Sequence, residues 1–370
     1  MKTLIKNGRL LDIKNKFNRE KLDILIENGI IKKIAENISE DNCKIIDIKN
    51  KIIAPGFIDI HVHCFPYNTA ISSIPDDIGI KKGVTTIIDA GTAGADTIDE
   101  FYQRFIEKSK TRIFVNLNIA SQGLKTLDEL SNMDNINEEK IKKAIKKYPN
   151  IIVGLKERAS GSVVKENGIK PIAEGKRIAL KYGLPVMVHI GNAPPKIEEV
   201  LPLLNKGDIV THCYHNKKTA LVREGKIISE VKEAMKRGVL FDVGHGSESF
   251  SFDTAAQGLA AGFECNTIST DLYGRNMISP VGSLENTINK ILYLGVPLEK
   301  CIEKVTNIPA EIFKLKKLGE LKEGYIGDLT IFDIVENGSL ELIDSVKKVI
   351  NVKKYIKTEY VFIKDELIKI

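Results

Sequence analysis

The sequence has no tryptophan, few aromatic residues and no long hydrophobic run. Only 6% of the 370 residues are aromatic. An uncharged apolar stretch of about 18 residues, which a membrane-spanning helix needs, is also missing. The first residues, MKTLIKNGRLLDIKNKF, carry charges every few positions and lack the apolar segment of a signal peptide. These absences predict a protein outside the membrane, with the cytoplasm as its default location.

Cysteine is also scarce. The five cysteines are odd in number and widely spaced, which suits a reducing compartment and does not predict a disulfide framework. Cys64 and Cys213 each follow a histidine at the end of an expected strand. Because neighbours on a strand point to opposite faces, we expect these two cysteines to be small buried apolar residues rather than metal ligands.

Charge of one sign is not in strong excess. The chain has 55 Lys and Arg against 49 Asp and Glu, a formal net charge of +6. The lysines are scattered, as in KIKKAIKKY, so we interpret them as solvated faces and not as a patch for nucleic acid. With 43% hydrophobic and 28% charged residues, the composition is that of a folded globular protein.

Both ends of the chain have the pattern of β-strands. Asn7-Gly8 and Asn28-Gly29 lie between apolar alternating runs, and Asn-Gly in this setting is a strong hairpin signal. Near the C-terminus, GYIGDLTIFDI and YVFIKDELIKI are again strand-like. We therefore expect residues 1–55 and 317–370 to form one small domain together, a β-sandwich.

Between these ends, residues 56–316 predict an α/β barrel. Apolar β-branched runs alternate there with helical patterns, and two helices, about 284–294 and 298–315, are expected after the last run. Eight parallel strands that are each followed by a helix form a (β/α)8 or TIM barrel, whose active sites lie at the C-terminal strand ends. The eight runs are FIDIHVH, VTTIIDA, RIFVNLNIA, IIVGLK, PVMVHI, DIVTHC, VLFDVG and NTISTD.

Histidines mark the ends of several of these runs. His61 and His63 end the first run as His-X-His, a spacing that puts both imidazoles on one face of a strand. Two histidines alone do not define a metal site. However, His189, His212 and Asp271 end the fifth, sixth and eighth runs, at the rim where barrels keep their catalytic residues. The pattern predicts a site for divalent metal, with zinc favoured by imidazole ligands.

Lys156 closes the fourth run, and side-chain alternation turns it toward the barrel interior. A charged lysine is costly there unless it is paired or chemically changed. One resolution is reaction of the neutral amine with carbon dioxide, giving a carbamate that bridges two metals. The alternative is an ammonium group that reaches solvent at the rim.

Taken together, APGFIDIHVH and these strand-end residues resemble the amidohydrolase superfamily, in the subtype with two metals bridged by a carboxylated lysine. The resemblance covers nearly the whole chain. GVTTIIDAGTAGADT, LPVMVHIGNAPP and TISTDLYGRN are similar to the amidohydrolase/deacetylase group, whose members include adenine deaminase-like and dihydroorotase-like proteins. The implied roles are His61 and His63 on one metal, Lys156 as the bridge, His189 and His212 on the other metal, and Asp271 as ligand and proton shuttle.

Two positions depart from the relatives. Dihydroorotases continue the metal motif as His-X-His-X-Arg, in which the arginine holds a substrate carboxylate, whereas this chain has Phe65 there. His215 stands in HCYHN, where a glycine-containing turn is expected. We therefore expect substrate contacts near the sixth strand to differ from those of relatives.

The resemblance implies a metal-dependent hydrolase in which two divalent metals activate water to attack an amide or ester. We expect a small acyl group, such as acetyl, to be removed from an N-acyl amino acid or an O-acyl hydroxy acid. Candidate substrate contacts are His245, after the seventh run, and Arg158 and Arg275, because a guanidinium fits a carboxylate. The alternatives are a buried core histidine and arginines that pair at the surface.

Three other functions stay open. They are hydrolysis of a cyclic amide, as in dihydroorotases and hydantoinases, deamination of a nucleobase, and a barrel that binds metal without catalysis. A deaminase on this scaffold usually needs one metal, which would leave the lysine ligand superfluous. The expected partner is a small-molecule substrate, with no nucleic acid or membrane, and the oligomeric state is left open.

Overall fold

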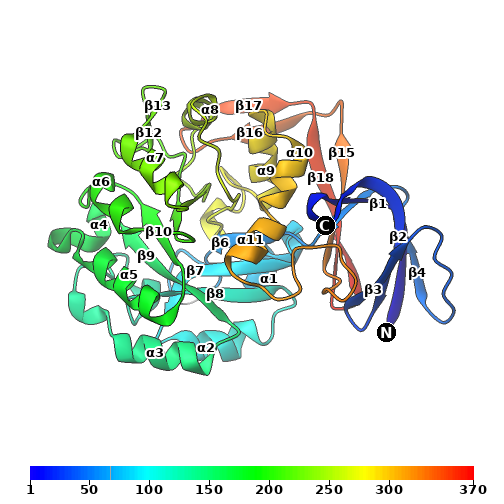
Figure 1. Cartoon of the computed structure of the whole chain (residues 1–370), viewed down its shortest axis with the longest axis horizontal. Coiled ribbons are helices and arrows are strands. Elements are labelled where there is room, and N and C mark those ends of the chain that lie inside the picture. The colour runs from blue at the N-terminus through cyan, green and yellow to red at the C-terminus, as the bar shows by residue number, and fades with distance from the viewer. Residues whose placement is uncertain (67) are drawn as a thin grey trace.

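The computed structural model describes residues 1–66 and 68–370, and a curled parallel sheet of seven strands forms its larger part (Figure 1). The strand order is β14-β11-β10-β9-β8-β7-β6, with every pair parallel. These strands confirm the first seven predicted runs. Their bounds are β6 Ile58–Val62, β7 Thr86–Gly94, β8 Arg112–Asn118, β9 Ile152–Ala159, β10 Val186–Ile190, β11 Ile209–Thr211 and β14 Leu240–Asp242.

The predicted eighth strand is not regular, yet it joins the two edges of this sheet. Bridges at residues 267 and 272 connect it in parallel to β14 and β6. Its pairing is irregular because a side chain replaces a backbone acceptor. Thr270 donates its backbone N–H and its hydroxyl to the Asp59 carboxylate, at 3.1 and 2.6 Å. The seven strands and this segment together make a TIM-like α/β barrel.

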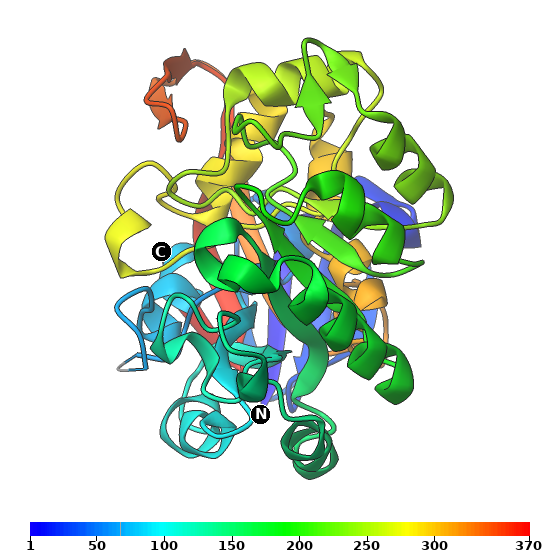
Figure 2. The same cartoon turned by 90° about the vertical axis from the view of Figure 1, so that its left-hand side faces the viewer.

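Helices surround the curled sheet on its outer side (Figures 1 and 2). Several begin with a side-chain cap, as where Asn137, Ser251 and Ser283 accept a hydrogen bond from the first turn. The helices up to α9 are α1 Pro75–Ile78, α2 Ile98–Phe101, α3 Glu138–Lys147, α4 Gly161–Val164, α5 Lys170–Tyr182, α6 Ile197–Val200, α7 Ser229–Lys236, α8 Phe252–Ala260 and α9 Leu284–Tyr293.

The single helix predicted over 298–315 is wrong. The chain forms two shorter helices, α10 Leu298–Glu303 and α11 Asn307–Ile312. A continuous helix would need an N–H from Pro309 to Val305 O, and proline has none. Val305 O instead accepts the backbone N–H of Ile58, at 2.7 Å, which ties this break to the start of β6.

The two ends of the chain form one sheet, as predicted, beside the barrel (Figure 1). The predicted sandwich is not confirmed, because all eight strands belong to one mixed sheet in which β4 and β5 pair with different stretches of β1. The domain boundaries at 55/56 and 316/317 stay a prediction. The strands are β1 Lys2–Asp12, β2 Phe17–Glu27, β3 Ile30–Ala35, β4 Lys44–Asp47, β5 Ile52–Pro55, β15 Leu329–Val335, β18 Tyr355–Ile363 and β19 Glu366–Lys369.

Of the two predicted Asn-Gly turns, one is confirmed. Asn28 and Gly29, with φ of 52° and 72°, connect β2 to β3. The hairpin predicted at Asn7 and Gly8 is wrong, because β1 continues through them with a register shift. A Cβ at position 8 would lie 2.3 Å from Ile53 Cδ1. Gly8 therefore lies in a β-bulge and packs closely against Ile53.

Two short hairpins lie outside the two larger sheets. β12 Val222–Arg223 pairs with β13 Lys226–Ile227, and β16 Leu340–Ile343 pairs with β17 Val349–Val352. Cys64 and Cys213 are buried in the main hydrophobic core, which confirms their predicted role. In the described part of the chain, every helix is too short or too polar to span a bilayer.

Strand β9 carries two adjacent charged residues that are both buried, Lys156 and Glu157. Glu157 faces α5, where a Cβ on Gly175 would lie 2.2 Å from its Oε1. Among the described residues, neither carboxyl oxygen of Glu157 has a hydrogen-bond partner. Burial, and secondly Asp208, raise the pKa of Glu157 well above its usual value, while Lys176 opposes this shift. The folded chain therefore holds a proton there that the unfolded chain releases.

We expect Glu157→Met to raise the free energy of unfolding at pH 8 by about 1–3 kcal/mol, because it removes a buried carboxyl group without a partner. In the wild type the raised pKa gives stability that is present below the unfolded pKa and lost as pH rises toward the folded pKa. The gain should therefore shrink toward pH 4. Urea unfolding across this range measures it, with exposed Glu166→Met as control. A variant no more stable than wild type at pH 8 contradicts the prediction.

Candidate metal centre and active site

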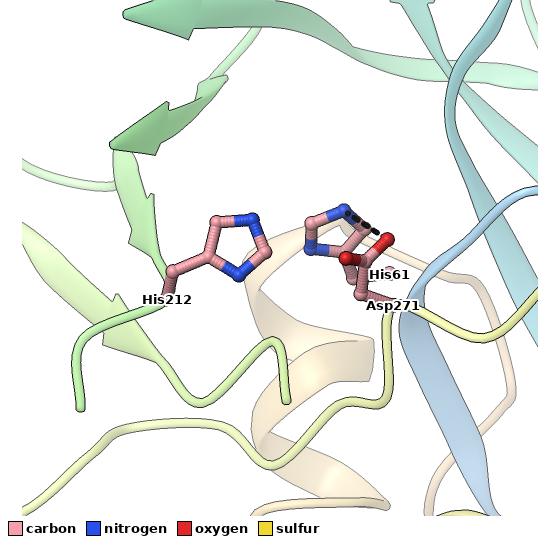
Figure 3. Close-up of side chains that lie close together, drawn as sticks. All are labelled: His61, His212 and Asp271. Atoms are coloured by element: carbon pink, nitrogen blue, oxygen red, sulfur yellow. Dashed lines mark ion pairs between the residues drawn. The ribbon is translucent and has the colours of Figure 1, made fainter. Parts of the chain in front are cut away.

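Five of the six predicted metal ligands line one cavity of about 350 Å³ at the C-terminal ends of the barrel strands, and the sixth, His212, lies beside them. Figure 3 shows His61, His212 and Asp271 facing one another, and their ligand atoms all lie within 4.8 Å. The other predicted ligands line the same cavity. The contacts within the set are Lys156 Nζ to His61 Nε2 at 3.1 Å, His63 Nε2 and His61 Nε2 to Asp271 Oδ1 at 3.1 and 3.5 Å, and His189 Nδ1 to His212 Nε2 at 2.7 Å.

Two of these residues have an uncommon backbone conformation. Asp271 and His212 have φ of 52° and 71°, in the left-handed region that few non-glycine residues occupy and that occurs at functional sites. Gly246 lies so close to Asp271 that a Cβ there would be 2.6 Å from Oδ2. The backbone of the loop after β14 therefore packs directly against this carboxylate.

Hydroxyl groups orient the first two imidazoles. Thr211 Oγ1 lies 2.9 Å from His61 Nδ1 and donates its own proton to Asp242 at 2.7 Å. Thr92 Oγ1 lies 2.9 Å from His63 Nδ1. Because the Thr211 hydroxyl donates its proton to Asp242, its oxygen accepts from Nδ1–H of His61, and the Nε2 lone pair of His61 faces the cavity, an arrangement common for metal-binding histidines.

Burial favours the neutral form of several of these nitrogen donors. It lowers the pKa of Lys156 to about 7, although Asp271 opposes the shift. It also lowers the pKa of His61 well below its usual value and that of His212 to about 4. Burial is the largest single influence on Asp271 and would raise its pKa, but His63, His212 and Lys156 together outweigh it and leave the pKa lowered. The site thus holds the neutral imidazoles of His61 and His212 beside an ionised carboxylate, and these are the forms that bind metal.

The three candidate substrate contacts lie in different places. Arg158 lines the cavity, and its Nη1 lies 3.0 and 3.3 Å from the two carboxylate oxygens of Glu129. Arg275 is exposed and is not among the described residues that line the cavity. His245 is buried outside the cavity lining, with Nε2 2.7 Å from Lys290 Nζ and Nδ1 against a backbone carbonyl. The contacts of His245 favour the alternative of a core histidine.

Several residues of the site were missed from the sequence. Tyr273, Lys217 and Glu248 line the cavity. Asp59 precedes His61 by two residues on the same strand, and an acid within an apolar run was a signal that could have revealed it. Loop residues such as Lys217 and Glu248 follow no periodic pattern, so the sequence contained no comparable signal for them.

Phe65, which replaces the arginine of dihydroorotases, packs in the core. It is buried and stacks on Phe101, with ring centroids 4.8 Å apart. An apolar side chain in this position cannot hold a substrate carboxylate.

Comparison with known proteins agrees with this geometry. The model of the amidohydrolase family matches residues 52–368. The chain belongs to the amidohydrolase family. It is therefore an enzyme of the hydrolase class that acts on small molecules, and divalent metals are general in this family.

The relatives of this amidohydrolase carry several names. A deacetylase of Enterococcus faecalis is 40% identical over 336 residues, which are 90% of this chain and 89% of that protein. A deacetylase of Agrobacterium fabrum is 37% identical over 87% of this chain and 80% of its own. The crystal structure of an adenine deaminase has a TM-score of 0.94 at 38% identity, covering 99% of both chains. That of a dihydroorotase has 0.93 at 34% identity, covering 100% and 97%.

We expect Thr211→Val to weaken metal binding by this amidohydrolase about 10- to 100-fold, because His61 loses the partner that orients its ring. Competition with a chelator of known affinity measures the effect. Thr287→Val is a matched control, since Thr287 is also buried but its hydroxyl donates to the carbonyl of Ser283, the residue that caps α9. An unchanged metal affinity in Thr211→Val would show that the threonine does not support the site.

Proposed function

We propose that this amidohydrolase removes a small acyl group, such as acetyl, from an N-acyl amino acid or an O-acyl hydroxy acid. The observation that carries the proposal is the convergence of the imidazoles, Lys156 and Asp271 on a cavity whose wall also carries the cations Arg158 and Lys217. Such a cavity offers a place for a reacting acyl group beside an anionic one. The similarity to two proteins named deacetylases supports this reaction.

The donor set fits two divalent cations. We infer that His61 and His63 hold one, through the Nε2 atoms that face the cavity, and that His189 and His212 hold the other. Zinc is the metal we expect, because neutral imidazole is among its commonest ligands. When bound, such cations polarise the acyl carbonyl and make water a better nucleophile near neutral pH.

The surroundings of Lys156 support a carbamate on its amine that would bridge the two metal ions. Its Nζ contacts His61, and among the described residues it forms no ion pair with a carboxylate. An ammonium group there would stay buried without its usual partner. In the reaction we propose, the neutral amine attacks carbon dioxide, a C–N bond forms, and one proton leaves to solvent. The product is an anionic ligand in place of a neutral amine.

Asp271 is the group that we propose moves the proton. Its Oδ1 lies 3.1 Å from His63 Nε2, and its side chain is 16% exposed toward the cavity. The carboxylate accepts a proton from the water that attacks the acyl carbon. It then donates that proton to the leaving nitrogen or oxygen as the C–N or C–O bond breaks. The products are the free acid and the amine or alcohol.

Two alternatives are kept as outcomes of the test. Deamination is favoured by the similarity to a structure titled as an adenine deaminase. Cyclic amide hydrolysis is favoured by the structure titled as a dihydroorotase, although buried Phe65 replaces the arginine that such enzymes use to hold a substrate carboxylate.

The test is a panel of acetylated amino acids, acetylated hydroxy acids, adenine and dihydroorotate, incubated with the zinc-loaded enzyme. We expect acetate release from an acetylated acid, and loss of about 10²–10⁴-fold in kcat for Asp271→Asn with metal retained, because a positioned proton shuttle contributes that much. Ammonia release from adenine or ring opening of dihydroorotate, without acetate release, would replace the proposal by one of the alternatives.

For the carbamate, we expect Lys156→Ala to lose most activity and to regain part of it with a short-chain carboxylic acid, which can supply the missing bridging oxygens. Activity and metal content are measured with and without added acetate or propionate. Removal of carbon dioxide from the buffer during metal loading should also lower the activity of wild type. A fully metal-loaded and active Ala variant without added acid would overturn the carbamate.

A further inference from the structure

The cavity wall carries two cations, but their charges are compensated to different degrees. Arg158 pairs with Glu129, whose side chain is 0% exposed, and the contact involves both carboxylate oxygens. A carboxylate that is buried in this way stays beside its arginine whether or not a ligand is bound. An anionic ligand at Arg158 would therefore also meet the charge of Glu129.

Lys217 is compensated far more weakly. Its one ion pair among the described residues is with Glu248, at 3.6 Å between Nζ and Oε2. The Glu248 side chain is 80% exposed, while that of Lys217 is 23% exposed. Exposed pairs of this kind are screened by water and contribute little. The ammonium of Lys217 is thus available to a second carboxylate that enters the cavity.

The loop that carries Lys217 is well anchored. The backbone N–H of Lys217 donates to His215 Nδ1 at 3.1 Å, and Lys217 O accepts from Ala220 N at 2.8 Å. His215 is fully buried and follows His212 on the same strand end. Because its Nδ1 accepts a hydrogen bond, its proton must lie on Nε2. This is the histidine that stands where the sequence predicted a glycine-containing turn.

We propose that Lys217 binds the carboxylate of the substrate, that His215 positions its loop, and that Glu248 competes with the substrate for the ammonium. The inference rests on the proposed function and names the residue that selects acids over neutral acyl compounds. Lys217 lies on the same cavity wall as the metal ligand His189. A charge-assisted hydrogen bond there holds the acid while its acyl group faces the metal centre.

The test compares N-acetylalanine with its neutral amide. We expect Lys217→Gln to raise KM about 10- to 100-fold for the acid, as loss of a hydrogen bond to a charged group does, with little change for the amide or in kcat. Glu248→Gln should lower KM for the acid about 2- to 5-fold, because the competitor is gone. The neighbouring Lys218→Gln is a matched control, since Lys218 is exposed and outside the cavity lining.

The positioning role of His215 has its own readout. His215→Leu should raise KM for the acid but not for the amide, and His215→Asn, which keeps a hydrogen-bond acceptor, should restore part of it. A rise in KM that is equal for the acid and the amide would mean that His215 only supports the fold.

Two results would overturn the role of Lys217. One is an equal change for acid and amide in Lys217→Gln. The other is an acid-specific change in Arg158→Met/Glu129→Gln, a pair that avoids an orphaned carboxylate, with none in Lys217→Gln. If wild type releases no acetate from either compound, the proposed function fails. The role of Lys217 is then decided by calorimetric titration of the zinc-loaded wild type and of Lys217→Gln with the acid and with the amide. Tighter wild-type binding of the acid that Lys217→Gln abolishes supports the anchor, and equal binding rejects it.

Discussion

The burial of several nitrogen donors around one small cavity is the constraint on which the rest of the structure depends. Burial opposes charge on His61, His212 and Lys156, so the pKa of each is lowered. A neutral imidazole that turns its lone pair toward the cavity needs a proton donor or a cation as the partner of that lone pair. The site is therefore arranged for a positive ion, and the ionised carboxylate of Asp271 faces the same space.

Barrel closure serves this arrangement directly. The eighth segment is held beside β6 by the carboxylate of Asp59 and by two backbone hydrogen bonds, from Asp271 N to His61 O and from His63 N to Leu272 O. Burial raises the pKa of Asp59 to about 7, and the hydrogen bonds from Thr270 oppose that shift. The backbone N–H of Asp271 donates to His61 O at 2.6 Å. With its left-handed φ, Asp271 places its carboxylate against His61 and His63. Fold closure and ligand placement thus depend on the same hydrogen bonds.

The departures from the predicted elements have local physical causes. Pro309 divides a helix because it has no N–H to donate. Asn7 and Gly8 form a bulge rather than a hairpin, because Ile53 from β5 packs against the glycine. In both cases the pattern along the chain was real, but a missing donor or a distant strand determined the outcome.

By itself, the sequence determined the barrel, the sheet formed from both chain ends and the candidate metal ligands. Alternation along a strand and the placement of barrel sites at strand ends are local rules, so His61, His63 and Lys156 could be assigned to the interior from their spacing alone. Only the tertiary structure decided which cations face the cavity. Arg158 is paired with buried Glu129, and Arg275 is exposed to solvent. Lys217, which lies on a loop, lines the cavity. Those positions depend on contacts between segments far apart in the chain, and no periodic pattern records them.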